Sequence, residues 1–397
     1  MQLPTIPSTM TTDPRIVRAA MREAARHAPA AIEEGTGLVY IFGYADIRRV
    51  LNDKVLKGAE LALFDLVGLT EGPLRDWYAG IMFAKDGDPH HRLRRLVSKA
   101  FTPKAVQTLR PIAAALVNER LARLQADGSG DLVELLHDVP MYVMCALLGV
   151  PEADVPRFLE WVDALTPVFT VMTPEQIETA TSAIGGLLDY TADLCRRREA
   201  EPASDLISAL IAAEEDGDRL TRTETAVMVA NLLVAGHDTT ASQTCCTSLT
   251  LVQRPDVMAM LRCNPNLLSS ITEETMRFEP SIVSSGRVPA SPYEVAGQTW
   301  PAGTFLMCAG ITANRDPEIW DRPDEFLPDR FLESDAPKMM SFGAGGHFCL
   351  GAWLARMTLE EVVRGVCDLE PTLATDVHTL EWIAPLGAYP ASLPVTL

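Results

Sequence analysis

A short glycine-rich loop that carries one histidine and one cysteine constrains this chain more than any other stretch. It runs from Ser341 to Arg356 and reads SFGAGGHFCLGAWLAR. Glycines let a backbone reach positive φ and approach a ligand closely, because they have no side chain. A helical pattern follows the loop, so the N–H groups at the start of that helix should lie near Cys349. We expect this position to lower the pKa of the Cys349 thiol and make it a ready metal ligand.

A single thiolate narrows the kind of metal site. A zinc site would need several protein ligands, and no second cysteine lies near Cys349 in the sequence. Haem iron needs only one such thiolate, because the porphyrin supplies the other donors. The alternative is a buried apolar cysteine in a glycine-rich turn, which is the usual role of a lone cysteine.

The loop resembles the haem-binding signature of the cytochrome P-450 family, Phe-Gly-x-Gly-x-His-x-Cys-x-Gly. The matching residues are Phe342, Gly343, Gly345, His347, Cys349 and Gly351. The resemblance implies a mainly helical fold with a minor β portion, in which haem lies between the long central helix and the helix after Cys349. It also implies haem b as the cofactor, no bound flavin, and Cys349 as the ligand of the iron.

Composition limits the partners of the chain. Its net charge of -19 and its pI of about 4.8 disfavour nucleic acid and anionic membranes as partners. The eight cysteines form no CxxC pair, which is typical of a reduced, intracellular protein. Residues 1–15 contain no signal-peptide core, and the apolar runs are shorter than the about 20 residues of a membrane span. We therefore expect a soluble, cytoplasmic protein without a membrane anchor.

The sequence pattern predicts one domain over residues 1–397, because no internal repeat or low-complexity linker interrupts it. Of the 397 residues, 47% are apolar, so the chain can bury a large core. We expect α-rich regions at roughly 90–280 and 350–370. We expect β-rich parts at roughly 37–60, 286–310 and 375–397.

A basic helix is predicted after His90 in this otherwise acidic chain. His90 and Arg94 are four residues apart and share a helix face, so together they can bind one carboxylate. The family has a His-x-x-x-Arg pair that binds a haem propionate, and the resemblance places this role on His90 and Arg94; a solvated basic face is the alternative. Arg92, Arg95 and Lys99 form another stripe, either a solvated face or, by the resemblance, the docking surface of an acidic ferredoxin-type partner.

A long apolar helix is interrupted in its middle by polar residues. The spacing of Thr221 and Glu224 predicts a capping box, and the apolar run continues to Gln253, just before Pro255. The sequence AGHDTT at 235–240 places a glycine and an acid inside this helix, where both are unfavourable. Such a local conflict indicates a functional site, and an ordinary kink in the core is the alternative.

This polar stretch matches the oxygen-binding motif Ala-Gly-x-Asp/Glu-Thr of the family. The resemblance implies that the helix opens locally, that Asp238 relays protons and that Thr239 donates a hydrogen bond during oxygen activation. It also places Ala235 and Gly236 against the cofactor. His237 fills the variable position of the motif, and we interpret it as structural.

The substrate pocket is defined mainly by position. Asn231 lies on the same helix face as Ala235 and Thr239, so its amide is either a substrate contact or satisfied internally. The resemblance adds segments before the second arginine and near the end of the chain. The predicted pocket residues are Asn231, Val234, Ala235, Val283, Ser284 and Leu386.

Two further charged motifs complete the pattern. Glu274 and Arg277 lie three residues apart on one helix face, and the resemblance implies that they form a buried network with Arg330. Arg287 occupies the position of the second propionate-binding arginine of the family, and His347 is a further propionate contact.

The resemblance implies that the chain activates O2 and inserts one oxygen atom into a small, largely apolar substrate by hydroxylation or epoxidation. Electrons would come from NAD(P)H through a reductase and a ferredoxin, because no flavin domain fits within this length. Oxidative coupling or a peroxide-driven reaction on the same scaffold is the alternative. A haem-based ligand sensor without turnover is the alternative from another class, but it has no need of the Asp238–Thr239 pair.

Overall fold

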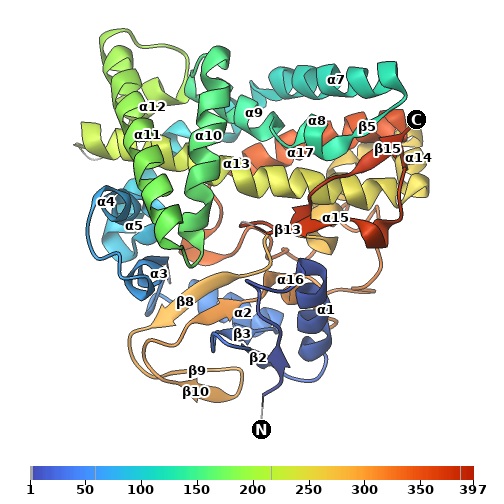
Figure 1. Cartoon of the computed structure of the whole chain (residues 1–397), viewed down its shortest axis with the longest axis horizontal. Helices are drawn as coiled ribbons and strands as arrows, with labels where there is room; N and C mark the ends of the chain where they lie inside the picture. Colours follow the sequence, from blue (N-terminus) through green and yellow to red (C-terminus); the bar gives the residue numbers. More distant parts are fainter. Residues whose placement is uncertain (1–2, 59, 216, 385) are drawn as a thin grey trace.

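In the computed structural model, most helices gather in one part of the molecule and the main sheet lies beside them (Figure 1). The structure describes residues 3–397 apart from 59, 216 and 385. The long helix α13 (Arg222–Val252) crosses the helical part next to α17 (Ala352–Leu369). The predicted capping box is confirmed, because Thr221 Oγ1 accepts from the Glu224 N–H at 3.2 Å and Glu224 Oε2 accepts from the Thr221 N–H at 2.8 Å.

The remaining α-helices of the described chain are shorter than α13. They are α1 (Pro14–Ala25), α2 (Tyr44–Asn52), α3 (Glu60–Leu66), α4 (Pro73–Gly80), α5 (Gly87–Ala100), α6 (Pro103–Gln107), α7 (Arg110–Asp127), α8 (Leu132–Leu136), α9 (Val139–Leu148), α10 (Val155–Leu165), α11 (Pro174–Ala200), α12 (Leu206–Ala212), α14 (Pro255–Cys263), α15 (Leu268–Phe278) and α16 (Gly310–Ala313). Buried side chains of α4, α9, α10, α11, α13 and α17 form one hydrophobic cluster. In the described part of the chain, no helix combines the length and the apolar content that a bilayer span requires.

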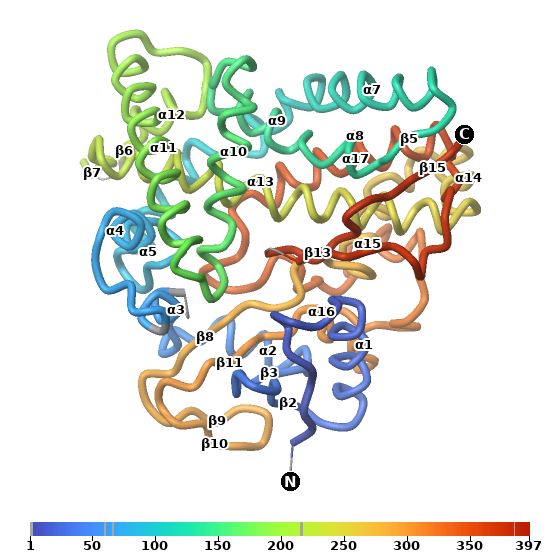
Figure 2. The backbone as a smooth tube through the Cα atoms, in the orientation of Figure 1, coloured from blue at the N-terminus to red at the C-terminus, as the bar shows by residue number. Residues whose placement is uncertain are grey.

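The main sheet joins segments that are far apart in the sequence. Its strand order is β1 (Thr5–Ile6), β2 (Ala30–Glu33), β3 (Val39–Ile41), β11 (Leu306–Cys308), β8 (Ser285–Pro289) and β4 (Leu56–Gly58). Strand β11 pairs parallel with β3 and antiparallel with β8, and Leu306 lies opposite Arg287. Figure 2 shows the blue N-terminal segments beside the orange segment that carries β8 and β11.

Small sheets complete the described strands. They are the hairpin of β9 (Tyr293–Val295) and β10 (Gln298–Trp300), the hairpin of β6 (Glu214–Glu215) and β7 (Asp218–Arg219), the pair of β13 (Trp382–Ile383) and β14 (Tyr389–Pro390), and the sheet of β12 (Thr372–Leu373), β15 (Pro394–Thr396) and β5 (Ser129–Asp131). The mainly helical fold with a minor β portion is confirmed, at 57% helix and 11% strand. The sequence did not indicate α1, β1 and β2, or α3 and α4 between residues 55 and 88, because these short elements depend on tertiary packing rather than on a local period.

A buried ion pair lies at the end of α15. Glu274 and Arg277 are both fully buried, with Nε to Oε2 at 2.6 Å and Nη2 to Oε1 at 2.8 Å. Arg330 Nε reaches Glu274 Oε1 at 3.1 Å, so the structure brings the three predicted network residues together. This geometry is the two-pronged arrangement in which arginine binds a carboxylate most strongly.

The same network extends to the start of the Cys349 loop. Arg277 Nη1 donates to the Asn314 carbonyl at 2.8 Å, and the Asn314 side chain binds both Ser341 Oγ, at 2.9 Å, and the Met340 N–H, at 2.6 Å. Ser341 Oγ in turn donates to the Met276 carbonyl at 2.8 Å. Helix α15 therefore fixes the point from which the glycine-rich loop departs.

A second buried arginine, Arg18, joins α1 to two segments that are distant in the sequence. Arg18 is 3% exposed and forms an ion pair with Glu279, just after α15. It also donates to the carbonyls of Pro280, Ser281 and Ala388, at 2.9, 3.2 and 3.1 Å. This arrangement, named the Arg18 junction below, ties α1 to the segment after α15 and to the segment before β14.

Replacing Arg277 by leucine should lower the free energy of unfolding by about 3–5 kcal/mol, because Glu274 would stay buried without its cation. Arg196→Leu is the matched control, since Arg196 forms the same i,i+3 pair with Asp193 while it is 63% exposed. The control should cost less than about 1 kcal/mol. Urea denaturation followed by far-UV circular dichroism measures both losses, and equal losses would contradict the prediction.

Candidate functional site

The loop before Cys349 is closed by backbone hydrogen bonds. The Cys349 N–H donates to the Phe342 carbonyl at 3.0 Å, and the Gly343 N–H donates to the Met340 carbonyl at 2.9 Å. Gly343 and Gly345 have φ of 68° and 71°, which favour glycine. A Cβ atom on Gly345 would also clash with the carbonyl oxygen at the end of α2. The loop therefore packs on α2 through a contact that only glycine allows.

The Cys349 sulfur lies at the start of α17. The N–H groups of Gly351 and Ala352, and the cations of Arg94 and Arg356, all act to lower the pKa of the Cys349 thiol. Desolvation of the thiol by the surrounding protein is nevertheless the largest effect, and it raises the pKa above the ordinary value. The prediction of a lowered pKa is therefore wrong for the chain alone. A coordinated metal cation would stabilise the thiolate and reverse this balance.

Two histidines and an arginine lie along the loop. His90 is 2% exposed, and its ring stacks on His347 with centroids 4.1 Å apart. His347 Nε2 is 3.1 Å from Asp86 Oδ1, and Arg94 donates to the Phe348 carbonyl at 2.6 Å. Burial, followed by the charges of His347 and Arg94, lowers the pKa of His90 to about 4. The predicted pair of α5 thus reaches the Cys349 loop.

Arg287 of β8 is a buried guanidinium that forms no ion pair with the described residues. It is 5% exposed and donates to the neighbouring Gly286 carbonyl at 2.7 Å. Among the described residues, neither Arg287 nor Arg94 forms an ion pair with a carboxylate. Burying such a cation is costly unless an anion accompanies it. One thiol, two unpaired guanidinium groups and two imidazoles are a donor set that fits an iron porphyrin with its two propionates.

The middle of α13 presents an accessible face inside an otherwise buried helix. Ala235 is exposed, and Gly236, Thr239 and Thr240 are half-buried, whereas their neighbours along the helix are buried. A Cβ atom on Gly236 would overlap the end of the Met144 side chain, so α9 approaches the helix closely here. The accessible face is where a bound group can contact α13.

The helix itself is α-helical throughout, so the local opening implied by the resemblance is not seen. Thr239 Oγ1 donates to the Ala235 carbonyl at 3.0 Å, and Ser242 Oγ donates to the Asp238 carbonyl at 2.7 Å. These hydroxyls bond back to the preceding turn, which threonine and serine do inside intact helices. The Thr239 hydroxyl must rotate before it can donate to a ligand.

Asp238 is a buried carboxyl whose side chain accepts one weak hydrogen bond from the described residues. It is 6% exposed, and its Oδ2 accepts from the Gly387 N–H at 3.4 Å. Burial raises the pKa of Asp238 to about 6; the Gly387 N–H acts downward and the charge of Asp163 acts upward. A carboxyl with this pKa exchanges its proton readily near neutral pH. Gly387 and Asp163 were not predicted as neighbours of Asp238, because only the fold brings them to α13.

The predicted pocket residues of α13 divide into two environments. Asn231 is 7% exposed, and its amide makes no hydrogen bond with the described residues. It lies on the helix face of Ala235 and Thr239, next to the accessible region. Val234 is 2% exposed and belongs to the main hydrophobic cluster instead.

The other predicted pocket residues lie outside α13. Val283 packs against the hydrophobic cluster that contains Tyr40, and burial raises the pKa of Tyr40 while the Ser284 side chain acts to lower it. Leu386 is half-buried next to the undescribed residue 385. Val283 and Ser284 thus lie beside the main sheet, whereas Leu386 precedes Gly387, which contacts Asp238.

The basic stripe of α5, formed by Arg92, Arg95 and Lys99, is partly covered by the β6–β7 hairpin. Arg92 forms ion pairs of 2.6 Å with both Asp218 and Glu224, and Lys99 donates to a hairpin carbonyl at 2.9 Å. Arg92 therefore binds two carboxylates of this protein, Asp218 in the hairpin and Glu224 on α13.

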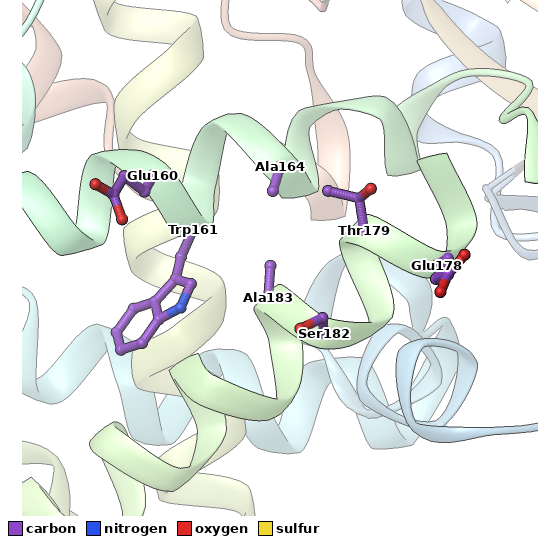
Figure 3. Close-up of a pocket in the computed structure, with 7 residues that line it drawn as sticks. All are labelled: Glu160, Trp161, Ala164, Glu178, Thr179, Ser182 and Ala183. Carbon is purple, nitrogen blue, oxygen red and sulfur yellow. The ribbon is translucent and has the colours of Figure 1, made fainter. Parts of the chain in front are cut away.

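A surface pocket between α10 and α11 lies apart from all of these residues (Figure 3). Trp161 and Ala164 line it from α10, and Ala183 lines it from α11. Glu160 and Glu178 lie at opposite ends of the pocket and do not converge on a common point. It contains none of the predicted site residues.

Comparisons with known proteins agree with this geometry. A family model described as Cytochrome P450 matches residues 34–364. Luteothin monooxygenase of Streptomyces thioluteus is 33% identical over 89% of this chain and 87% of its own length. Cyclomarin C epoxidase CymV of Salinispora arenicola is 35% identical over 85% of each chain. The crystal structure of CalO2 superposes with a TM-score of 0.87 at 30% identity, covering 96% of each chain. The chain belongs to the cytochrome P450 family and is, like these relatives, a haem-iron monooxygenase.

Proposed function

We propose that this chain is a haem-thiolate monooxygenase that uses O2 to hydroxylate or epoxidise a small, largely apolar substrate. The observation that carries the proposal is the Cys349 thiol at the start of α17, with the Arg94 guanidinium acting on it and with Arg287 acting on Asp86, which contacts His347 of the same loop. A catalytic site needs these charges to be placed before the reaction begins.

The proposed cofactor is haem b, with no bound flavin. Cys349 would hold the iron, and His90, Arg94, Arg287 and His347 would bind the propionates. When bound, haem supplies the activation of oxygen, to which a thiolate ligand contributes electron density. The remaining motif residues shape the loop. They are Phe342, Gly343 and Gly351, and the Phe342 ring lies 4.4 Å from the Arg356 guanidinium.

Asp238 and Thr239 would handle protons in the middle of α13, Asp238 from a buried position and Thr239 from the accessible face. Asp238 holds or releases a proton at its buried carboxyl near neutral pH. Thr239 would rotate its hydroxyl away from the Ala235 carbonyl and donate a hydrogen bond into the pocket. Such positioned proton transfer contributes about 10²–10⁴-fold in rate.

The proposed substrate is an apolar secondary metabolite. The relatives include enzymes named for luteothin and cyclomarin C, and a structural neighbour was solved with erythromycin B. The buried Asn231 amide, which lacks a partner among the described residues, would bind a polar group of the substrate. Ala235 and Leu386 would contact its apolar surface.

The proposed electron donor is a ferredoxin-type protein, which receives electrons from NAD(P)H through a reductase. It would dock on the Cys349 side, with Arg92, Arg95 and Lys99 as candidate contacts. Because Arg92 already pairs with Asp218 and Glu224, an acidic donor would compete with these groups for the cation. The eight cysteines are all free, which supports a reducing cytoplasmic location.

The dithionite-reduced protein should show the carbon monoxide spectrum of a thiolate-ligated haem, and Cys349→Ser should lose it. Cys263→Ser is the matched control, because Cys263 is exposed and far from the motif in sequence, and it should keep the wild-type spectrum. Difference absorption spectroscopy measures all three proteins. A histidine-type spectrum in the wild type, or a thiolate spectrum in Cys349→Ser, would refute the proposal.

Asp238→Asn should gain stability relative to the wild type as pH rises. A carboxyl whose folded-state pKa is raised from 3.8 to about 6 binds its proton more tightly in the folded state, so the wild type loses stability between about pH 4 and pH 6. The asparagine variant has no such loss. Its thermal midpoint minus that of the wild type should increase over this range and stay constant above it.

Asp13→Asn is the opposite control for this measurement. The Arg15 side chain holds the pKa of Asp13 below its ordinary value, so this carboxylate stabilises the folded state above about pH 4. The Asp13→Asn difference should therefore fall as pH rises to about 4 and stay constant between about pH 4 and pH 6, where the Asp238→Asn difference increases. A flat Asp238→Asn difference over that range would show that Asp238 does not carry a raised pKa.

A further inference from the structure

The imidazole rings of His237 and His137 each carry one buried nitrogen atom without a hydrogen-bond partner among the described residues. His237 is 1% exposed on α13, and His137 is half-buried at the end of α8. Their rings meet edge to face, with centroids 5.4 Å apart and planes at 90°. Nδ1 of His237 and Nε2 of His137 are sealed from solvent, and each lacks a hydrogen bond to the described residues.

A water bound between the rings would satisfy both nitrogens. An unpaired buried polar atom destabilises a fold, and a buried water typically makes about three hydrogen bonds. Burial lowers the pKa of His237 to about 3 and lowers the pKa of His137 below its ordinary value. Both rings are therefore neutral near pH 7, and each has one nitrogen that donates and one that accepts.

The segment before and within β14 connects this histidine pair with Asp238. The ring of Tyr389 stacks on His137, with centroids 5.1 Å apart. Gly387, two residues earlier, donates to the Asp238 carboxylate at 3.4 Å. Burial, followed by the charge of Asp238, raises the pKa of Tyr389, which places its hydroxyl in the field of that carboxylate. His137, His237, Tyr389 and Asp238 therefore border one polar region.

Other charged groups face this region from the neighbouring elements. Asp163 of α10 acts to raise the pKa values of Asp238 and Tyr389. Asp138 follows His137 and forms an ion pair with Arg120 at 3.0 Å. His137 is the partly exposed member of the histidine pair, so it is the point at which the region meets solvent.

We propose that His137 and His237, bridged by a buried water, form the path along which protons reach the Asp238 carboxyl from the surface. The inference deepens the proposed function and rests on the proton-relay role of Asp238. His137 takes a proton from solvent at Nδ1 and releases its Nε2 proton to the water. The water passes a proton to Nδ1 of His237, which releases its Nε2 proton to the Asp238 carboxylate directly or through a second water.

One net proton moves in this sequence and no electrons are transferred. Each N–H bond that breaks is matched by one that forms on the same ring, so both rings end in the other neutral tautomer. Water-assisted tautomerisation, in which one nitrogen of each ring loses its proton and the other nitrogen regains one, restores the starting state. His137 and His237 are thus relay residues that act through Asp238.

The first test is structural and needs no turnover. A high-resolution crystal structure of the haem-bound protein should show one water within about 2.7–3.2 Å of both His237 Nδ1 and His137 Nε2. The His137→Phe variant should lose this water. A dry contact between the two rings in the wild type would overturn the proposal.

The second test measures proton supply without an identified substrate. A plant-type ferredoxin and its NADPH reductase serve as surrogate donors, and NADPH oxidation and hydrogen peroxide are followed in H2O and D2O. His137→Phe and His237→Gln should each oxidise NADPH about tenfold more slowly, with a larger solvent isotope effect and a larger share of peroxide. Glutamine can still bind the water, but it cannot exchange one ring tautomer for the other.

Thr244→Val is the matched control, because Thr244 is another buried α13 residue whose hydroxyl has no partner among the described residues. It should keep the wild-type rate, and both histidine variants should keep the wild-type carbon monoxide spectrum. If the wild type lacks a thiolate spectrum, the proposed function itself fails. If it has that spectrum and both histidine variants keep the wild-type rate and peroxide share, only the proton path is overturned.

Discussion

The buried pair of Glu274 and Arg277 is the interaction on which the rest of the site depends. Two fully buried charges are tolerated only when their hydrogen bonds are all used, and Arg277 donates to three backbone carbonyls besides its carboxylate partner. One of these carbonyls belongs to Asn314, whose side chain holds the start of the loop that carries Cys349. The buried ion pair therefore helps to position the loop, because Asn314 binds the Arg277 guanidinium through its carbonyl and the start of the loop through its side chain.

The positive charges of the site come from separate segments and converge only in the fold. Arg94 lies on α5 and Arg287 lies on β8, and the register of β8 with β11 places Arg287 opposite Leu306. The chain is strongly acidic overall, yet these cations have no carboxylate partner among the described residues, whereas Arg92 on the same helix has two. The contrast on a single helix distinguishes a cation that stabilises the fold from one that awaits an anionic ligand.

The sequence predicted those features that depend on residues close together in the chain. The capping box at Thr221 and the extent of α13 follow from residues a few positions apart, and the resemblance pointed to Arg330. The pKa of Cys349 could not be predicted, because it depends on whether helix N–H groups or desolvation dominates. His237 was interpreted as structural because it fills the variable position of the motif. Its contact with His137 could not be predicted, because it depends on how α8 packs beside α13.

The Arg18 junction has a consequence for the order in which the chain gains its structure. Arg18 is separated by 261 residues from Glu279 and by 370 residues from Ala388. Contacts between such distant positions form slowly, and during synthesis the junction cannot close before residue 388 has left the ribosome. Helix α1 can pack on β1 and β2 early, but Arg18 cannot complete its hydrogen bonds until the end of the chain is made. The segment before β14, which contacts Asp238 through Gly387, is therefore held in part by the first helix to be synthesised.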